Sequence, residues 1–272
     1  MSLSETKSLL RTHRILPNKL LGQNFMVDCS LFPKLADCAS LDMADVVLDA
    51  GAGFGFLTRF LANKCKTVVA VEKDPRVAEV LREQIKSSNN VVVVEGDVLR
   101  AEVPDFNKVI SIPPYYLSSH LVTWLLDRRF ECAVLVLQQE FGKRLIASVG
   151  SEDYGWLAVV TGQRAEVKLL DAVPKWMFYP EPEVDSAVVT LKPWATPPFT
   201  VKDAAFFRRL VRWLFTERNK KLCNALTPFI RSERKADKAE AERIASSVPY
   251  CDRRVRELSS RAFGAVADAL VN

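Results

Sequence analysis

The sequence predicts an α/β domain, built on a mostly parallel sheet with a hairpin at one edge, followed by a small all-helical domain. Two patterns along the chain support this fold class. Before residue 193, short β-branched runs alternate with segments whose apolar residues recur at helical spacing, which is typical of a parallel sheet. A proline-rich break at residues 193–198 then marks a domain boundary, and only helical spacing follows it.

The expected elements follow one another in a regular order. The first strand covers residues 46–48 and leads through a glycine-rich turn into a helix that contains Leu57, Phe60 and Leu61. The later sheet elements are strands at residues 67–71, 91–94, 108–110 and 132–137, helices at 118–126 and 140–147, and an edge hairpin of 166–172 with 186–192. The tail is expected to form helices at residues 204–215, 236–246 and 260–270.

The glycine-rich turn predicts a ligand site. Gly51, Gly53 and Gly55 follow Asp49, so the pattern is G-x-G-x-G with an acid two residues ahead. Glycines let the backbone turn tightly and approach a ligand closely. A dinucleotide loop would have G-x-G-x-x-G instead. The spacing resembles motif I of class I methyltransferases, which bind S-adenosylmethionine (SAM), and a turn without a ligand is the alternative.

Two further acids follow the next strands. Glu72 ends the second strand, where it could accept hydrogen bonds from both ribose hydroxyls of an adenosine, and Asp97 follows the third, where an adenine amino group needs an acceptor. Either acid alone is more often a solvated charge. Because open parallel sheets bind ligands along this edge, the two acids and the glycine turn together favour SAM.

Residues 112–115 (IPPY) predict chemistry on an exocyclic amine. They follow the fourth strand, where enzymes that methylate such amines have [Asn/Asp/Ser]-Pro-Pro-[Tyr/Phe]. The nitrogen lone pair is delocalised into the ring, and carbonyls that accept both N–H bonds draw it toward sp³ geometry. Prolines fix the backbone carbonyl, and a ring such as Tyr115 stacks on the base. In isolation, a simple turn would be the better interpretation.

Composition excludes several other classes of protein. The 272 residues are 49% hydrophobic and 26% charged, which is ordinary for a soluble globular protein. No apolar stretch is as long as a membrane span, and the first residues lack the apolar centre of a signal peptide. The six cysteines form no C-x-x-C pair and there are only two histidines, so we expect no metal site and a reducing cytoplasm.

The charge is unevenly distributed. Residues 199–272 contain 16 Lys and Arg against 9 Asp and Glu, a net charge of +7, whereas the whole chain has +5. A basic tail suggests a polyanionic partner, nucleic acid ahead of membrane, although a solvated basic surface is an equal alternative on charge alone. A second basic element precedes the sheet and contains Lys7, Arg11, Arg14 and Lys19.

Taken together, these motifs resemble the ribosomal RNA adenine N6-dimethyltransferase family nearly from end to end. The most specific blocks are residues 19–28 (KLLGQNFMVD) and 178–186 (FYPEPEVDS). The other matching segments are residues 49–55, Glu72, 96–97, 154–155, 215–226 and 256–259.

The resemblance implies a Rossmann-like, SAM-dependent methyltransferase domain at residues 29–195. It also implies a basic N-terminal arm with a SAM-contacting segment at 1–28, and a helical rRNA-binding domain at 199–272. The implied substrate is a pair of adjacent adenines near the 3′ end of small-subunit rRNA, methylated during ribosome biogenesis on a precursor of the small subunit. A cytoplasmic monomer is expected, without metal or membrane.

The resemblance also assigns roles to residues at matching positions. The implied SAM contacts are Asn24, the Met26 backbone, Gly51 under the methionine part, Gly53, Glu72 at the ribose, Asp97 at the adenine, and Ile112. The implied catalytic residues are Ile112, Pro113 and Pro114 at the amine, with Tyr115 and Phe178 on either side of the base. The implied RNA contacts are Lys7, Arg11, Arg14, Arg218, Lys220 and Lys221.

One residue departs from the family pattern. The family usually has Asn where this chain has Ile112, and isoleucine cannot accept a hydrogen bond. A one-residue slip could bring the Ser111 hydroxyl near the amine, although alternation along a strand directs it to the other side. The alternative functions are a ribosome-assembly factor that binds pre-rRNA with weak or no methylation, and a resistance enzyme that methylates large-subunit rRNA. A dinucleotide oxidoreductase fits the glycine spacing less well.

Overall fold

The computed structural model describes residues 3–18 and 21–271 and divides the chain into two compact units. The sheet unit contains the residues up to Gly142 together with Glu166–Pro193. The helical unit contains Lys143–Ala165 and the residues from Trp194 onward. The sequence prediction put a single boundary between residues 195 and 199. The compact units also change near Trp194, and in addition they group Lys143–Ala165 with the tail.

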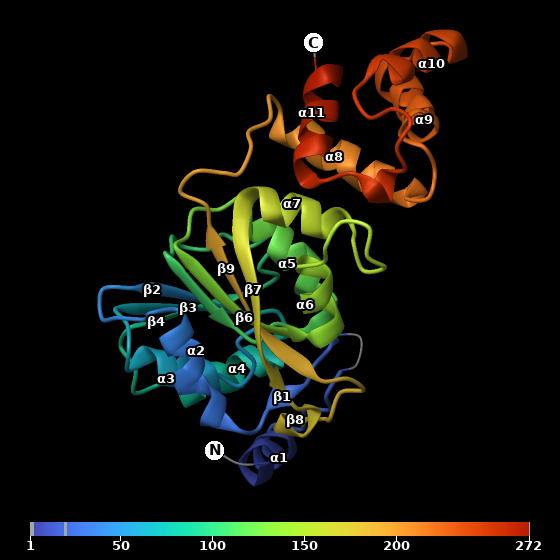
Figure 1. Cartoon of the computed structure of the whole chain (residues 1–272). Coiled ribbons are helices and arrows are strands. Elements are labelled where there is room, and N and C mark those ends of the chain that lie inside the picture. The colour runs from blue at the N-terminus through green and yellow to red at the C-terminus, as the bar shows by residue number, and fades with distance from the viewer. Residues whose placement is uncertain (1–2, 19–20, 272) are drawn as a thin grey trace. The chain divides into compact units, whose positions relative to one another are not determined.

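A seven-stranded sheet forms the centre of the sheet unit, in the order β4-β3-β2-β5-β6-β9-β7 (Figure 1). Its strands are β2 (Val46–Ala50), β3 (Thr67–Glu72), β4 (Val91–Glu95), β5 (Lys108–Ser111), β6 (Cys132–Gln138), β7 (Ala165–Val173) and β9 (Ser186–Pro193). Strands β2 to β6 pair in parallel, and β9 pairs antiparallel with β6. The predicted α/β class is confirmed, with β7 and β9 neighbours at one edge.

The strand register aligns the carboxyl ends of the parallel strands. Ala50 on β2 lies opposite Val71 on β3, and Glu72 lies opposite Glu95 on β4. The loops after β2, β3, β4 and β5 therefore emerge at one edge of the sheet, which is where open α/β sheets bind ligands.

Helices precede, connect or follow these strands, and the last of them runs from the sheet unit into the helical unit. They are α1 (Leu3–Thr12), α2 (Phe32–Cys38), α3 (Phe56–Ala62), α4 (Pro75–Gln84), α5 (Ser118–Leu125) and α6 (Gln139–Leu145). Helix α4 was not among the predicted elements, although its start is well defined. The Asp74 side chain accepts a hydrogen bond from the Arg76 N–H and Pro75 occupies the first turn, a favourable start for a helix.

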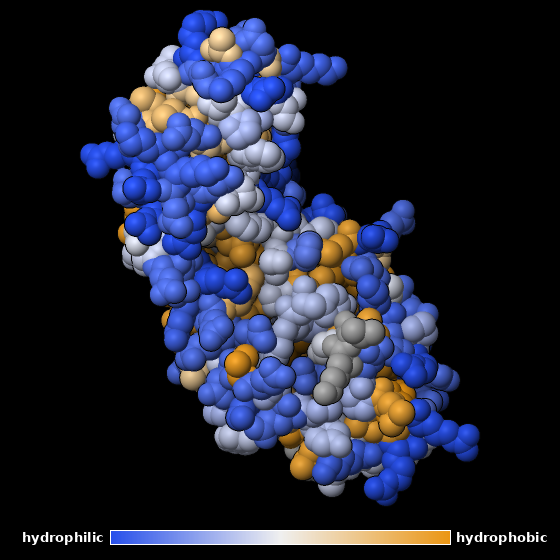
Figure 2. Space-filling view, turned by 90° about the vertical axis from the view of Figure 1, so that its right-hand side faces the viewer, coloured by the Kyte–Doolittle hydropathy of each residue, from blue (hydrophilic) through white to orange (hydrophobic). Residues whose placement is uncertain are grey.

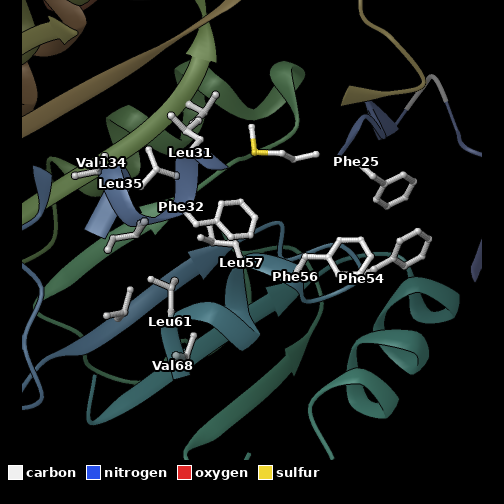
Figure 3. Packing of buried hydrophobic residues seen from close by; sticks show 14 of the residues in the cluster. Phe25, Leu31, Phe32, Leu35, Phe54, Phe56, Leu57, Leu61, Val68 and Val134 are labelled. Carbon is white, nitrogen blue, oxygen red and sulfur yellow. The ribbon is translucent and has the colours of Figure 1, made fainter. Parts of the chain in front are cut away.

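Helices α2 and α3 pack against one face of the sheet (Figure 3). Leu35 of α2 and Leu61 of α3 are fully buried in the same cluster as Val68 of β3 and Val134 of β6. Burying a side chain of this size stabilises the fold by about 1.5–3 kcal/mol. The apolar residues whose spacing predicted α3 therefore form the face of this helix that packs against the sheet.

An aromatic stack joins the opening segment to the glycine turn. The rings of Phe25 and Phe54 are stacked with centroids 4.2 Å apart, and Phe56 meets Phe54 edge-on at 6.0 Å (Figure 3). Phe25 belongs to the two-residue strand β1 (Phe25–Met26), which pairs antiparallel with β8 (Phe178–Tyr179). Two segments far apart in sequence thus meet beside the glycine turn.

The helical unit is built from α7 (Trp156–Arg164), α8 (Ala204–Leu214), α9 (Leu222–Arg234), α10 (Lys238–Ser247) and α11 (Ser260–Leu270). Three tail helices were predicted and are confirmed. Helix α9 was not predicted, and it contains Pro228, a residue type that normally ends a helix. Hydrogen bonds within this unit hold α7: the Trp194 N–H donates to the Arg164 carbonyl, and Tyr154 donates to the Leu258 carbonyl.

Short 3-10 turns complete the described elements, at Cys29–Leu31, Tyr115–Leu117, Lys175–Met177, Phe215–Glu217 and Val255–Glu257. Hydrophilic side chains cover most of the face shown in Figure 2, and hydrophobic residues form separate patches there. Within residues 3–18 and 21–271, no helix is long and apolar enough to cross a membrane.

Candidate active site

One pocket opens at the carboxyl edge of the sheet and brings together most of the residues that the sequence singled out. From the predicted set, it is lined by Asn24, Gly51, Gly53, Glu72, Asp97, Ile112, Pro113, Pro114, Tyr115 and Phe178. Met26 lines an adjoining pocket that shares Asn24, Gly51 and Ile112 with the first. Six separate segments of the chain therefore converge on one site.

The glycine turn lies against the loop that follows β5. Gly51 has a φ of +82°, and a Cβ built there would lie 2.6 Å from Cδ of Pro114. The Gly51 N–H also donates to the Val71 carbonyl at 2.8 Å, which fixes the turn to the end of β3. Only glycine satisfies both the left-handed backbone and the close approach. Gly51 therefore sets the distance between the predicted cofactor turn and the predicted base clamp.

The Glu72 carboxylate is bound by three backbone N–H groups. Its Oε2 accepts from Gly53 at 2.9 Å, and its Oε1 accepts from Lys73 and Asp74, each at 2.9 Å. A carboxylate has about four acceptor positions, so about one remains for a ligand hydroxyl. Binding both ribose hydroxyls, as the sequence suggested, requires one backbone bond to be given up. Burial raises the pKa of Glu72, and the three hydrogen bonds offset only part of this rise.

Asp97 is paired with Lys73 across the pocket. The Lys73 Nζ donates to Asp97 Oδ2 at 3.0 Å, and the Leu99 N–H donates to Oδ1 at 3.1 Å. Burial raises the pKa of Asp97, but these hydrogen bonds outweigh it, so the pKa is lowered overall and the carboxylate stays ionised. An ionised acceptor suits the predicted contact with an adenine amino group, for which Lys73 is a competitor.

Asp49, the acid that precedes the glycine turn, is almost completely buried. Its Oδ2 accepts a hydrogen bond from the Thr58 hydroxyl at 2.7 Å, and the residue lines the adjoining pocket. Burial raises the pKa of Asp49 to about 7, against the Thr58 hydrogen bond and with the help of the charge on Glu72. A buried acid near neutral pKa beside a ligand pocket is typical of functional sites.

The one-residue slip that would bring the Ser111 hydroxyl near the amine is not present, and Ser111 lies on the side that strand alternation indicates. Ser111 is fully buried, and its hydroxyl donates to the Ala50 carbonyl at 2.6 Å and accepts from the Ala50 N–H at 3.1 Å. The hydroxyl therefore joins β5 to β2 and is absent from the pocket lining. Ile112 does line the pocket, and it also packs against the core cluster. The remaining acceptors at this point of the pocket are backbone carbonyls.

Tyr115 and Phe178 line the same pocket from different segments. The Tyr115 hydroxyl and the Ser186 hydroxyl are 2.7 Å apart, within hydrogen-bond distance, and Ser186 is fully buried at the start of β9. Phe178 is buried on β8. Ser186 thus fixes the direction of the Tyr115 ring, a role that its place at the end of a sequence motif did not reveal.

The opening segment contributes through its backbone and amides. The Gln23 Nε2 donates to Asp74 Oδ2 at 3.0 Å, and the Asn24 Nδ2 donates to the Gly22 carbonyl at 3.4 Å. These bonds place Asn24 at the pocket. Two residues of the predicted opening motif, Lys19 and Leu20, lie outside the described residues.

The basic residues predicted for RNA fall into two groups. In the sheet unit, Lys7, Arg11 and Arg14 line a groove that α1 forms with Tyr179. In the helical unit, the Lys220 carbonyl accepts from the Val255 N–H, and Lys221 forms a β-bridge with Arg254. The loop that contains the predicted lysines is thereby paired with a second basic segment.

Arg218 has a structural role within the helical unit. Its guanidinium donates to the carbonyls of Glu152 at 2.8 Å and Ser151 at 3.1 Å. Lys220 forms an ion pair with Glu217 at 3.0 Å, and Lys221 with Asp252 at 3.5 Å, both at exposed positions. Exposed ion pairs of this kind are weak, so both ammonium groups remain open to a polyanion.

Sequence reasoning missed several residues at these sites. Lys73 and Tyr116 line the pocket, and their places directly after Glu72 and Tyr115 were the only signal. Arg253 and Arg254 lie beside the predicted lysines through pairing between distant segments. Such pairing leaves no periodic pattern in the sequence.

Comparison with known proteins gives consistent matches. The model of the family described as "Ribosomal RNA adenine dimethylase" matches residues 16–260. A Methanosarcina barkeri protein named "Probable ribosomal RNA small subunit methyltransferase A" is 40% identical over 82% of this chain and 77% of its own. A solved dimethyladenosine transferase from Plasmodium falciparum has a TM-score of 0.74 and 25% identity over 89% of this chain and 95% of its own. The solved 23S rRNA methyltransferase ErmE has a TM-score of 0.64 and 28% identity over 92% and 100%.

Replacing Asp49 by Asn should change how stability depends on pH. Native Asp49 keeps its proton up to about pH 7, whereas an ordinary Asp loses it near 3.8, so the native state binds more protons between these values. Its contribution to stability therefore falls as pH rises through this window, by at most about 1.4 kcal/mol per pH unit. Asp49→Asn should gain stability relative to wild type from pH 4 to pH 8.

Urea unfolding of both proteins at several pH values measures this difference. The matched control is Asp105→Asn, an acid at an exposed position. For each variant, the difference in unfolding free energy from wild type is followed with pH. If this difference changes with pH no more for Asp49→Asn than for Asp105→Asn, the prediction is wrong.

Replacing Gly51 by Ala should separate the clash with Pro114 from backbone strain. Gly150 has the same φ of +82°, but a Cβ there meets nothing within 4 Å. Gly150→Ala should therefore lose only the strain of a left-handed alanine, roughly 1–2 kcal/mol. Gly51→Ala should lose more stability in urea unfolding, and methylation should fall by about 100-fold because the clamp is displaced. Equal effects of the two substitutions would show that the contact with Pro114 is unimportant.

Proposed function

The chain belongs to the ribosomal RNA adenine dimethylase family, and from this premise we propose that it dimethylates N6 of adjacent adenines near the 3′ end of small-subunit rRNA during ribosome biogenesis. As a member it is a SAM-dependent rRNA adenine dimethyltransferase with a Rossmann-like fold. The name of the Methanosarcina barkeri relative supports the small subunit as substrate. The observation that carries the proposal is the single pocket in which Glu72, Asp97 and the IPPY loop meet.

The lining of the pocket suits SAM in its chemistry. Gly51 and Gly53 of the glycine turn line the pocket, and the Gly53 N–H donates to the Glu72 carboxylate. We assign Glu72 to the ribose and Asp97 to the adenine of SAM. Asn24 and Met26 would hold the methionine part with Gly51, and Ile112 would close the site between cofactor and target. When bound, SAM supplies an electrophilic methyl group.

The residues of this chain position the target amine. Tyr115 and Phe178 would hold the extruded adenine between their rings, with Tyr115 oriented by Ser186. Base stacking on an aromatic ring contributes about 1–3 kcal/mol per base. The Ile112 and Pro113 carbonyls would accept the N6 hydrogens and draw the nitrogen lone pair away from the ring. The fixed φ of the following prolines keeps these carbonyls in place.

The domains predicted from the sequence have separate proposed tasks. Residues 29–195 would bind SAM and the target base, and residues 199–272 would bind the rRNA backbone through Lys220 and Lys221, helped by Arg253 and Arg254. Residues 1–28 would add RNA contacts through α1. The basic charge of the tail supports this division. We further propose that the protein acts as a monomer in the cytoplasm on a precursor of the small subunit.

A ribosome-assembly factor without efficient methylation is the second candidate, and Ile112 is the observation that favours it. With Ser111 bonded to β2, the chain has no side-chain acceptor at this position. Against this candidate, the pocket keeps both acids and the glycine turn in one place. Those features serve SAM and would be unnecessary in a protein that only binds RNA.

Nucleoside mass spectrometry tests the proposed function. Small subunits lacking the modification are incubated with the protein and labelled SAM, and the modified positions are mapped. Dimethyladenosine at two adjacent positions near the 3′ end is expected. Methylation of large-subunit rRNA alone would support activity like that of ErmE, and tight binding without methylation would support the assembly factor.

Replacing Ile112 by Asn should accelerate methylation. A carbonyl acceptor at this position should raise the single-turnover rate by up to about 10²–10³-fold, by analogy with one oxyanion-hole donor. The second methyl should gain more, because a monomethylated amine has one N–H left and depends on whichever acceptor remains. Wild type should therefore accumulate more monomethyladenine than the variant. Ile112→Val is the control without an acceptor, and equal rates for all three proteins would contradict the prediction.

Replacing Lys220 and Lys221 by Gln should reduce the salt dependence of RNA binding. Each lost phosphate contact lowers the slope of log K against log salt by about 0.9 on duplex RNA, taking the value for B-DNA. Lys86→Gln, on an exposed lysine of the sheet unit, is the control. An unchanged slope in the double variant, measured by titration at several salt concentrations, would assign the tail a purely structural role.

A further inference from the structure

Strand β8 has a different pocket on each of its faces. Phe178 lines the proposed active site, whereas the next residue, Tyr179, lines a groove formed with α1. Consecutive strand residues point to opposite faces, so the two sites are separated only by this short strand. Figure 1 shows α1 beside the β1–β8 pair.

The groove combines apolar surface with positive charge. Its apolar side includes Leu16, which is 82% exposed, together with Pro17 and Tyr179. Its charged side consists of Lys7, Arg11 and Arg14. An apolar side chain this exposed is stabilised when a ligand covers it. Because three cations lie beside it, the groove suits a ligand that is both flat and anionic.

The cations of the groove are available for such a ligand. The Lys7 ammonium lies over the Tyr179 ring, 5.0 Å from its centroid. Across the part of the chain that the structure describes, Arg11 and Arg14 form no ion pair. Two arginines without an acidic partner make a phosphate site more favourable than a site for a neutral peptide.

We propose that this groove binds the nucleotide next to the target adenine in the substrate RNA. The base of that nucleotide rests on Leu16 and Pro17, and its phosphate is held by Arg11 and Arg14. This inference depends on the proposed function, because it needs an RNA strand with one adenine already in the pocket beside Phe178. It adds a specificity site for a single-stranded neighbour on the other face of β8.

The nucleotide explanation is favoured by position as well as by chemistry. An extruded base leaves its two neighbours at the rim of the pocket, and β8 is part of that rim. A groove on the opposite face of this strand is within reach of the adjacent nucleotide. An acidic peptide would find the same charges but would have no reason to adjoin the base pocket.

The test combines a change in the RNA with a change in the protein. The substrate is an RNA hairpin with two adjacent adenines in its loop, and the altered RNAs have an abasic residue on the 5′ or the 3′ side of the target. An abasic residue keeps the phosphate and removes the base. The protein variant is Leu16→Ser, whose exposed position keeps the fold intact, and the control is Leu3→Ser, an exposed leucine at the start of α1 that does not line the groove.

Dissociation constants from fluorescence anisotropy and KM values for methylation are measured for each pair. For wild type, one of the two abasic RNAs should bind about tenfold more weakly. Leu16→Ser should lose a similar factor on the intact RNA, and no further affinity on that abasic RNA. Leu3→Ser should behave as wild type, and kcat should change less than KM throughout.

The outcomes separate this inference from the proposed function. If the losses from Leu16→Ser and from the abasic residue multiply, the two groups do not contact each other and the inference is overturned. The same holds if neither change affects binding while methylation proceeds normally. If the losses fail to multiply but no RNA is methylated, the groove binds the neighbouring nucleotide and the proposed activity is wrong.

Discussion

The close approach of the glycine turn to the loop after β5 is the constraint on which the rest of the site depends. A side chain at Gly51 would collide with Pro114, so the backbone of Gly51 packs directly against the ring of Pro114. On its other side the turn is held by the Gly53 N–H on Glu72 and by Phe25, whose ring stacks on Phe54. Because these contacts share one short turn, the proposed cofactor pocket and the proposed base clamp are held in one arrangement, as a reaction that needs precise alignment requires.

Buried acids at and beside the same turn lower the stability of the protein when no ligand is bound. Asp49 and Glu72 are both buried, and burial raises the pKa of each. Asp49 has one hydrogen bond from Thr58, which offsets only part of the cost of burying its charge. SAM is a cation at its sulfonium and amino groups, and it would favour the ionised form of nearby acids. The charge of the pocket would therefore suit SAM, the ligand we propose for it, better than it suits the protein without a ligand, a compromise common at functional sites.

The sequence predicted the sheet and most of the pocket because both follow local rules. Glu72 and Asp97 each follow a run of β-branched residues that forms a strand. Because parallel strands bring these ends to one edge of the sheet, the sequence predicted that the two acids lie in one site. The remaining features are non-local. Helix α9 tolerates Pro228 because packing, rather than propensity, maintains it, and Lys143–Ala165 groups with the tail through hydrogen bonds that span the sequence. The pairing of Lys221 with Arg254 is of the same kind.

Ser111 shows how a strand restricts the chemistry at its end. Its hydroxyl both donates to and accepts from Ala50, so it replaces ladder hydrogen bonds between β5 and β2 just where the strands separate. That use fixes the β5 end, and alternation then directs Ile112 into the pocket. The amine clamp that we propose for this chain consequently consists of backbone carbonyls alone. Backbone carbonyls are held rigidly by the prolines and cannot turn to follow an amine that reorients after its first methyl. A side-chain amide can turn, and for this reason we expect the residue at position 112 to affect the second transfer more than the first.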